Sequence, residues 1–367
     1  MKIHLLGDSI VQSGLGSKFY SGWGDYLSAF LKSSVEVRNY ARGGRSSRSF
    51  LNEGRFCDNG QFTVEDAPFE LGPALPAIEA GDYVLIQFMH NDDDTGGVSY
   101  RVNKQVILGE PDEKGVYPTV EPKESMLVST DYWIPGYPEC LYAEGKTEAQ
   151  VQTIMETIKE LLAECGKQYY PYDCGATYKG YLKYYVDWIH EKGAIPILVT
   201  APVRHCFVDE KIVPLPGHHG GKDAYHEYPY VEAVKQLGDE LGVTVIDLFA
   251  ATKKMYELLG SEDSSYLHTI SIDEGSVNEA KVGNESPVWP DEYDRRRKEK
   301  DFRGLDTVHS NRYGAFLHAA LIVGLLHEQN LLKEWGLEVP SKYEQMPEHL
   351  IPRKAELEAL CIKANTV

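Results

Sequence analysis

Three residues near the start of the chain, Gly7-Asp8-Ser9, stand where an apolar run ends and a polar turn begins. The run "KIHLL" has the length and apolar character of a buried strand. A strand that ends in Gly-Asp-Ser can hold one hydroxyl at the carboxyl edge of a parallel sheet, where open α/β folds bind their ligands. A serine hydroxyl acts as a nucleophile only when other groups activate it, so the sequence must also supply a base, an acid and donors for an oxyanion.

Candidate partners for Ser9 occur in three further polar blocks. The block "LDTVHSNRYGA" contains His309, which can act as the base, and Asp306, which lies three residues earlier and can reach the other imidazole nitrogen within one turn. The block "QFMHNDDD" provides the side-chain amide of Asn91, and the block "NYARGGRSSRSF" provides a backbone N–H from either of its two glycines. With the Ser9 N–H, these donors form a candidate oxyanion hole for acyl transfer.

Strand and helix patterns alternate along the chain and bring these blocks to one edge of a sheet. Five apolar runs bounded by Gly, Asn, Asp or Pro predict fully covered parallel strands: "KIHLL", "VEVRNYA", "DYVLIQFM", "AIPILVT" and "VTVIDLF". Apolar residues at three- and four-residue spacing predict helices at 22–33, 148–165, 181–193, 230–242 and 313–329. This alternation predicts an α/β fold built as a three-layer α/β/α sandwich.

A single domain, residues 1–328, accounts for this pattern, with two interruptions. Residues 92–138 are rich in Gly, Pro and charge, and residues 272–302 contain the charged run "DEYDRRRKEKDF". Both segments are predicted insertions, and because they adjoin the polar blocks we expect them to wall the Ser9 site. Residues 329–367 are predicted to form a C-terminal helical extension packed on the same domain, which is also a candidate homodimer contact.

Composition and charge exclude several function classes. The 367 residues carry a formal net charge of −19, which would repel nucleic acid and anionic membrane surfaces. The six cysteines lack C-x-x-C spacing, so neither a zinc ribbon nor a disulfide scaffold is predicted. No apolar run is long enough to span a bilayer, and no secretory signal precedes the first strand. We therefore expect a cytoplasmic protein with reduced thiols and with neither a nucleic-acid nor a membrane partner.

The four polar blocks, in this order, resemble those of the SGNH (GDSL-type) hydrolases. Three of the motifs, "NYARGGRSSRSF", "QFMHNDD" and "DTVHSNRYGA", are similar over their full length to those of rhamnogalacturonan acetylesterases, a carbohydrate esterase family 12-like group. The resemblance covers residues 3–326 without the two insertions. The resemblance implies a flavodoxin-like fold with a five-stranded parallel sheet. It also implies deacetylation of plant cell-wall saccharides, above all acetylated rhamnogalacturonan or pectic oligosaccharides, without a cofactor or a metal ion.

The resemblance also assigns roles to individual residues. These are the triad Ser9, Asp306 and His309 and the oxyanion hole of Ser9, Gly44 and Asn91. Gly44 rather than Gly43 matches the N-x-A-x-x-G-R-S wording. One departure is Met89, where relatives commonly carry glycine before His-Asn-Asp, and a methionine there is expected to narrow the pocket beside Asn91.

Several residues are candidates for contacts with the saccharide. Arginines gather around the predicted oxyanion glycine: Arg38, Arg42, Arg45, Arg48 and Arg55. In a strongly acidic chain such a cluster fits a uronate-bearing substrate, although each arginine can equally pair with a carboxylate and fix a loop. An aromatic side chain at a helix start, such as Trp23, can stack on a sugar or belong to the core. The predicted substrate contacts are Trp23, Arg45, Arg48, Met89 and Arg204.

Three alternative functions stay open at this stage. An esterase for acetyl-xylan or another small ester would use the same residues. A metal-dependent phosphoesterase would also draw Asp, Asn and His from several blocks, although an Asp-x-His pair after the first strand is missing. A non-catalytic saccharide-binding protein would keep the fold without the chemistry. His218 and His219 in "LPGHHGG" are a candidate metal pair or a solvated loop, and His90 is expected to be structural.

Overall fold

The structure, a computed structural model, describes residues 1–13, 21–58, 62, 71–93, 106–122, 147–153, 156, 176–214, 223–272, 302–331, 335 and 348–361. Most of the two predicted insertions, the histidine pair at 218–219 and most of the predicted helix at 148–165 lie outside the described residues. Within them, no helix combines the length and the apolar character needed to cross a membrane.

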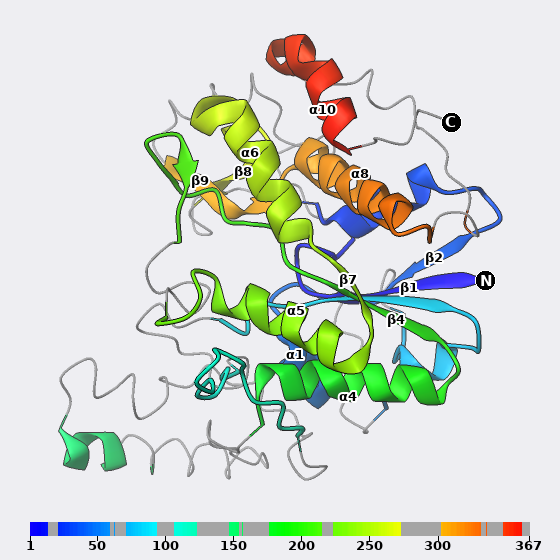
Figure 1. The fold of residues 1–367 in the computed structure, drawn as a ribbon, viewed down its shortest axis with the longest axis vertical. Coiled ribbons are helices and arrows are strands. Elements are labelled where there is room, and N and C mark those ends of the chain that lie inside the picture. Colours follow the sequence, from blue (N-terminus) through cyan, green and yellow to red (C-terminus); the bar gives the residue numbers. More distant parts are fainter. Residues whose placement is uncertain are drawn as a thin grey trace.

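A five-stranded parallel sheet forms the centre of the molecule, as the apolar runs predict (Figure 1). Its strands are β1 (Lys2–Gly7), β2 (Glu36–Asn39), β3 (Tyr83–Gln87), β4 (Ile195–Val199) and β7 (Thr244–Ile246). They lie in the order β2-β1-β3-β4-β7, and every neighbouring pair is parallel. This is the 2-1-3-4-5 order of flavodoxin-like folds, whose ligand crevice lies where the strand order reverses, outside the ends of β1 and β3. The predicted fold class is confirmed.

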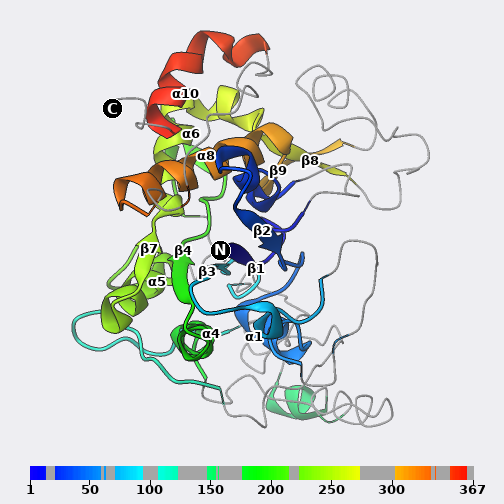
Figure 2. The same ribbon diagram turned by 90° about the vertical axis from the view of Figure 1, so that its right-hand side faces the viewer.

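Helices cover both faces of this sheet and make the three layers (Figures 1 and 2). One layer contains α1 (Ser47–Asn52), α4 (Tyr178–Glu191) and α5 (Pro229–Leu241). The other contains α6 (Leu248–Ser265) and α8 (Arg312–Glu328), with α10 (Lys354–Cys361) packed on α8. The helices predicted at 181–193, 230–242 and 313–329 are confirmed, whereas α6 has no counterpart in the sequence prediction.

The predicted helix at 22–33 is wrong in type. This segment forms two short 3-10 helices, η1 (Trp23–Asp25) and η2 (Leu27–Phe30). Its first N–H groups are tied to the turn that follows β1, because Gly22 donates to the Gln12 carbonyl at 3.1 Å and Trp23 donates to the Ile10 carbonyl at 2.8 Å. The segment nevertheless buries its apolar residues beneath α8, as the spacing implies.

A separate antiparallel pair of strands, which is not among the five predicted strands, carries the block that contains His309. The strands are β8 (His268–Ile272) and β9 (Phe302–Ser310). Their register is irregular: His268 pairs with Ser310 and Ile270 pairs with Leu305, so β9 has three more residues than β8 between these two pairs. The extra residues form a bulge over 306–309, and bulges of this kind redirect side chains out of a regular strand.

Aromatic packing fixes α1 against α4. The Tyr185 ring of α4 lies 6.4 Å from the Phe50 ring of α1, 4.7 Å from the Phe56 ring and 5.6 Å from the Phe88 ring, measured between centroids. Its hydroxyl donates to the backbone carbonyl of Ser47, in the first turn of α1, at 2.7 Å. Buried aromatic side chains contribute much of a core's stabilisation, so α1 has a firm position beside the end of β3.

The described part of the C-terminal extension packs on the same core. Leu350 of η7 (Glu348–Arg353) and Leu357 of α10 are fully buried. Trp335 is also buried, and its ring lies 4.7 Å from that of Tyr83 at the start of β3.

Candidate active site

Ser9 lies directly after β1, at the carboxyl edge of the sheet. Gly7 ends the strand where space is short, since a Cβ at this position would lie 2.6 Å from the carbonyl oxygen of Gln87 in the neighbouring β3. The Asp8 carboxylate then accepts the N–H of Ile10 at 2.9 Å, which holds the chain in a turn at Ser9. The turn leaves Ser9 6% exposed.

Ser9, His309 and Asp306 form a continuous chain of hydrogen bonds. The Ser9 Oγ lies 2.9 Å from Nε2 of His309, and Nδ1 of the same ring lies 2.8 Å from Oδ2 of Asp306. The other carboxylate oxygen of Asp306 accepts the backbone N–H groups of Val308 and His309 at 2.8 and 2.9 Å. The structure thus brings together the three residues predicted as a triad, in the order of a nucleophile, a base and a group that orients the base.

The bulge in β9 makes this arrangement possible. In a regular strand, residues three apart point to opposite faces, so Asp306 could not reach the ring of His309. Backbone bonds from other parts of the chain hold the bulged strand: the His205 N–H donates to the Thr307 carbonyl at 2.8 Å, and the Ser21 N–H donates to the Ser310 carbonyl at 3.0 Å.

The Asp306 carboxyl group is ionised in this setting. Burial on its own would raise its pKa, but the hydrogen bond and charge of His309, together with the two backbone N–H groups, outweigh burial and lower the pKa to about 2. A carboxylate beside Nδ1 favours the imidazole tautomer whose Nε2 accepts a proton, and Nε2 is the atom that faces Ser9.

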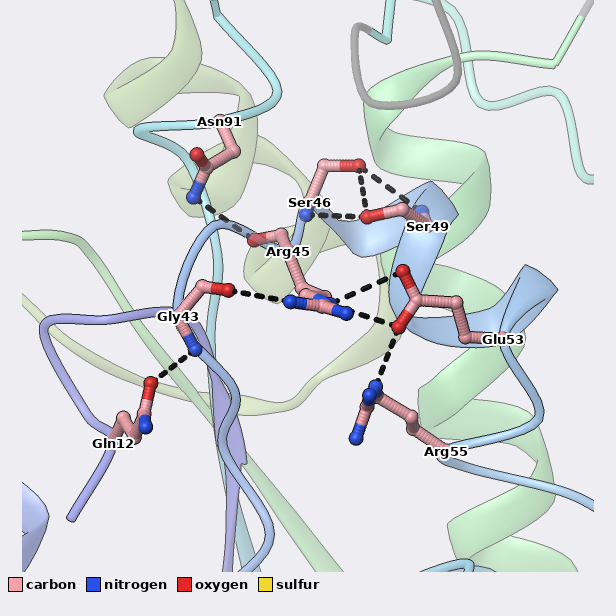
Figure 3. Close-up of polar contacts among 8 residues, drawn as sticks. All are labelled: Gln12, Gly43, Arg45, Ser46, Ser49, Glu53, Arg55 and Asn91. Atoms are coloured by element: carbon pink, nitrogen blue, oxygen red, sulfur yellow. Dashed lines mark hydrogen bonds and ion pairs between the residues drawn. The ribbon is translucent and has the colours of Figure 1, made fainter. Parts of the chain in front are cut away.

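A glycine turn, of which Figure 3 draws Gly43 and Arg45, lies beside the end of β1, because the Arg42 N–H donates to the Gly7 carbonyl at 3.0 Å. The Arg45 N–H donates to the Arg42 carbonyl at 3.3 Å, and Gly44, with φ +74°, occupies the third position of this turn, where a positive φ favours glycine. The Gly43 N–H already donates to the side-chain oxygen of Gln12. In the described part of the chain the Gly44 N–H has no acceptor, so the structure favours Gly44 over Gly43 as an oxyanion donor.

Asn91 lies across from this turn, after the end of β3. Its side-chain Nδ2 donates to the backbone carbonyl of Arg45 at 3.1 Å, which fixes the plane of the amide (Figure 3). The side chain is nearly buried. Because the ends of β1 and β3 are neighbours in the sheet, the donors that follow them lie at the same edge as Ser9.

Two further carboxyl groups are buried next to the site, one beside Ser9 and one beside Asn91. Burial raises the pKa of Asp8 to about 6 and that of Asp92 to about 8, so Asp92 holds a proton at neutral pH. Asp92 accepts the Ser47 N–H at 2.9 Å and also the Ser47 hydroxyl. It therefore ties the segment after β3 to the first turn of α1.

Most of the side chains predicted to contact the substrate are buried or paired within the protein. Trp23 is fully buried and its Nε1 donates to Gln87 at 2.9 Å, so the ring has no face for a sugar. Met89 and Arg48 are also buried, 0% and 2% exposed, so neither side chain presents surface to a substrate in this structure. Arg45 is engaged by Glu53 within the protein.

Arg204 is half-buried, whereas Trp23, Met89 and Arg48 are buried. It follows β4, and its charge acts on Asp8, whose pKa it helps to lower against the larger effect of burial. A contact of Arg204 with the substrate stays a prediction. His90, expected to be structural, is buried.

Three polar residues near the site were missed by the sequence analysis: Gln12, Glu53 and Gln87. The Gln87 side chain joins Trp23 to Asp8, with 2.9 Å to the indole nitrogen and 3.4 Å to the carboxylate. None of the three belongs to a recognisable spacing, so only the fold reveals them. Among the described residues, no group of three or more His, Cys, Asp or Glu side chains is arranged to hold a metal ion.

Known proteins resemble this chain in sequence. The rhamnogalacturonan acetylesterase RhgT of Bacillus subtilis is 25% identical over 332 residues, which are 90% of this chain and 91% of that protein. The rhamnogalacturonan acetylesterase of Emericella nidulans is 35% identical over 137 residues, which are 37% of this chain and 44% of that protein. The solved structure of the Bacillus subtilis protein YxiM matches with a TM-score of 0.46 at 19% identity, over 90% of this chain and 57% of that one. No protein-family model matches the sequence.

Proposed function

We propose that this chain, an SGNH-type carboxylic ester hydrolase related to the rhamnogalacturonan acetylesterases, removes O-acetyl groups from plant cell-wall saccharides. The observation that carries the proposal is the hydrogen-bonded chain from the Ser9 Oγ through His309 to Asp306. The two acetylesterases described above are named for rhamnogalacturonan. Their names support an acetylated pectic oligosaccharide as the substrate.

In the first half of the proposed reaction, the Ser9 Oγ attacks the carbonyl carbon of the acetyl ester while Nε2 of His309 takes the hydroxyl proton. The imidazolium that forms is stabilised by Asp306, whose low pKa keeps it negatively charged. Collapse of the tetrahedral intermediate breaks the bond to the sugar oxygen, and His309 returns its proton to that oxygen. The products are a free sugar hydroxyl and an acetyl group bound to Ser9.

In the second half, His309 takes a proton from water, and the resulting nucleophile attacks the acetyl carbon on Ser9. Acetate leaves and Ser9 regains its proton. In both halves the negative oxygen is proposed to accept hydrogen bonds from the Ser9 N–H, the Gly44 N–H and the Asn91 amide.

The test is acetate release, measured on acetylated rhamnogalacturonan oligosaccharides and on acetylated xylo-oligosaccharides of similar length. We expect wild-type protein to release acetate from the pectic substrate with the higher kcat/KM. Ser9→Ala should lower kcat by about 10⁶-fold, the usual cost of removing a nucleophile from such a triad. Ser265→Ala serves as the matched control, because its hydroxyl is exposed and donates to the Glu262 carbonyl within α6.

Each unfavourable result has a distinct meaning. Unchanged acetate release by Ser9→Ala would overturn the mechanism. Faster deacetylation of the xylo-oligosaccharides would overturn the pectic substrate and leave an acetyl-xylan esterase. Loss of activity with EDTA, restored by zinc or manganese, would favour the metal-dependent phosphoesterase, and saccharide binding without any acetate release would favour a binding protein.

A further inference from the structure

An arginine that the sequence marks as a substrate contact is instead built into the turn that holds the predicted oxyanion donors. Arg45 lies between Gly44 and Ser46, and Ser46 is the N-cap of α1. The Arg45 side chain is 16% exposed and the Glu53 side chain is 14% exposed, so this ion pair is largely shielded from solvent. Figure 3 shows the guanidinium group between the Gly43 carbonyl and the Glu53 carboxylate.

The carboxylate of Glu53 fixes the guanidinium group from one side. Nε of Arg45 lies 2.8 Å from Oε2 and 3.1 Å from Oε1 of Glu53. Glu53 is held in turn by Arg55, whose Nε lies 2.6 Å from the same Oε2 and whose side chain is only 6% exposed. Glu53 is the C-cap of α1, so the pair joins the residue before the N-cap to the C-cap.

On its other side, the guanidinium group binds the peptide unit between Gly43 and Gly44, whose N–H is the predicted oxyanion donor. Nη1 of Arg45 donates to the Gly43 carbonyl oxygen at 3.0 Å. That carbonyl belongs to the same planar peptide unit as the Gly44 N–H, so fixing the carbonyl fixes the direction of the N–H. A cationic donor on the carbonyl oxygen also polarises the peptide unit and strengthens its N–H as a donor.

The main chain of Arg45 acts on the second donor. Its carbonyl oxygen accepts a hydrogen bond from Nδ2 of Asn91 at 3.1 Å, which sets the orientation of the amide (Figure 3). One residue therefore holds both Gly44 and Asn91, the first through its side chain and the second through its backbone. Movement of Arg45 would displace the two donors together.

We propose that Arg45, held by Glu53, is a positioning residue that sets the oxyanion hole by fixing the Gly43–Gly44 peptide unit and the Asn91 amide. This inference rests on the proposed ester hydrolysis at Ser9. It concerns the rate of acyl transfer and is independent of which saccharide carries the acetyl group.

The experiment measures hydrolysis of 4-nitrophenyl acetate, with the concentration of active Ser9 determined by titration with a fluorophosphonate. We expect Arg45→Met to lower kcat by about tenfold to a hundredfold with little change in KM, since misplaced donors stabilise the transition state less than the bound ester. Glu53→Gln keeps the size of the side chain and should lower kcat in the same direction. Arg45→Lys keeps the charge without the forked geometry and should not restore the rate.

The matched control is Arg353→Met. Arg353 also pairs with a glutamate, at 2.8 Å to Oε2 of Glu356, and also donates to a backbone carbonyl, that of Leu258 at 2.6 Å. It lies in η7, away from the Ser9 turn, so its removal should leave kcat per titrated Ser9 unchanged. Thermal unfolding of all variants separates lost stability from lost rate.

A double-mutant cycle with Asn91→Ala identifies the route by which Arg45 acts. When Arg45 works through the two donors, the combined loss of kcat should be clearly smaller than the product of the two single losses. Wild-type kcat in folded Arg45→Met, or fully multiplicative losses, would overturn the proposal. If Arg45→Met does not fold, wild-type kcat in both Arg45→Lys and Glu53→Gln would overturn it equally. Absence of Ser9-dependent hydrolysis in the wild type would count against the proposed function instead.

Discussion

Gly7 of β1 pairs with Gln87 of β3 at the last step of the parallel register between these strands. The pairing puts the turn that carries Ser9 directly beside the segment that leads to Asn91. A side chain at Gly7 would press on Gln87, whose carbonyl oxygen would lie 2.6 Å from the new Cβ, and on Val11, whose Cγ2 would lie 2.5 Å away.

Gly7→Ala is therefore expected to destabilise the fold and to disturb the Ser9 turn. Overpacking of this kind typically costs about 1–3 kcal/mol of the free energy of unfolding. Chemical denaturation measures the change, and the control is Gly72→Ala, because a Cβ at Gly72 would meet no atom within 4 Å. Equal stability of the two variants would contradict the crowding at Gly7.

Asp306→Asn is expected to lower kcat by about 10⁴-fold, a loss of the size seen when the acid of a serine hydrolase triad becomes an amide. The amide nitrogen would face Nδ1 of His309 and favour the tautomer with the proton on Nε2, which cannot take the Ser9 proton. The check is kcat on an acetyl ester, with the melting temperature measured alongside. A loss of less than tenfold would remove Asp306 from this role.

Asn91→Ala should keep the nucleophile and the base but remove one donor to the oxyanion. The expected loss in kcat is about 10²- to 10³-fold, with KM changing much less. The rate of Ser9 labelling by a fluorophosphonate should fall in parallel, since that reaction also places negative charge on an oxygen in the same site. A normal labelling rate combined with a normal kcat would exclude Asn91 as a donor.

Asp92→Asn isolates a pH dependence of stability that the wild type carries. The pKa of Asp92 is about 8 in the folded protein and about 3.9 in an unfolded chain. The protonated form therefore contributes stability that is complete below about pH 4 and is lost as pH rises through about 8. The difference in melting temperature, wild type minus Asp92→Asn, should decrease between pH 5 and about pH 8 and level off above that pH. A difference that is constant over this range would show that Asp92 is not buried as a neutral acid.

The sequence pattern predicts a strand or helix correctly where the surroundings of that element alone determine its structure. The three inner strands, β1, β3 and β4, follow from apolar runs because they are buried along nearly their whole length, so neighbouring residues of each run lie in the same apolar environment. The three- and four-residue spacing of apolar residues predicts the helix α8 in the same way. The segment 22–33 has helical spacing too, yet hydrogen bonds from Gly22 and Trp23 to the turn after Ser9 impose tighter 3-10 geometry. Those bonds join parts of the chain whose proximity only the fold defines.

For the candidate site, too, the sequence predicts some features and only the fold reveals the others. The types of Ser9, Asp306 and His309 and their order along the chain are visible in the sequence, but the bulge that lets Asp306 reach His309 depends on pairing with β8 across residues 273–301. From the sequence alone, the arginine cluster fits a uronate-binding site as well as it fits ion pairs with carboxylates of the protein. Burial of Arg48 and the pairing of Arg45 with Glu53 come from the position of α1, which the aromatic contacts of Tyr185 determine.

Ser9 and His309 are 300 residues apart in the chain although their side chains are in hydrogen-bond contact. During synthesis the nucleophile leaves the ribosome first and the base leaves it last among the groups of the site. A nascent chain that has already formed β1 and β3 thus has a serine without a base and cannot turn over an ester. The proposed hydrolysis therefore requires that β9 has been made and has docked, so the appearance of activity during translation would report the arrival of that strand.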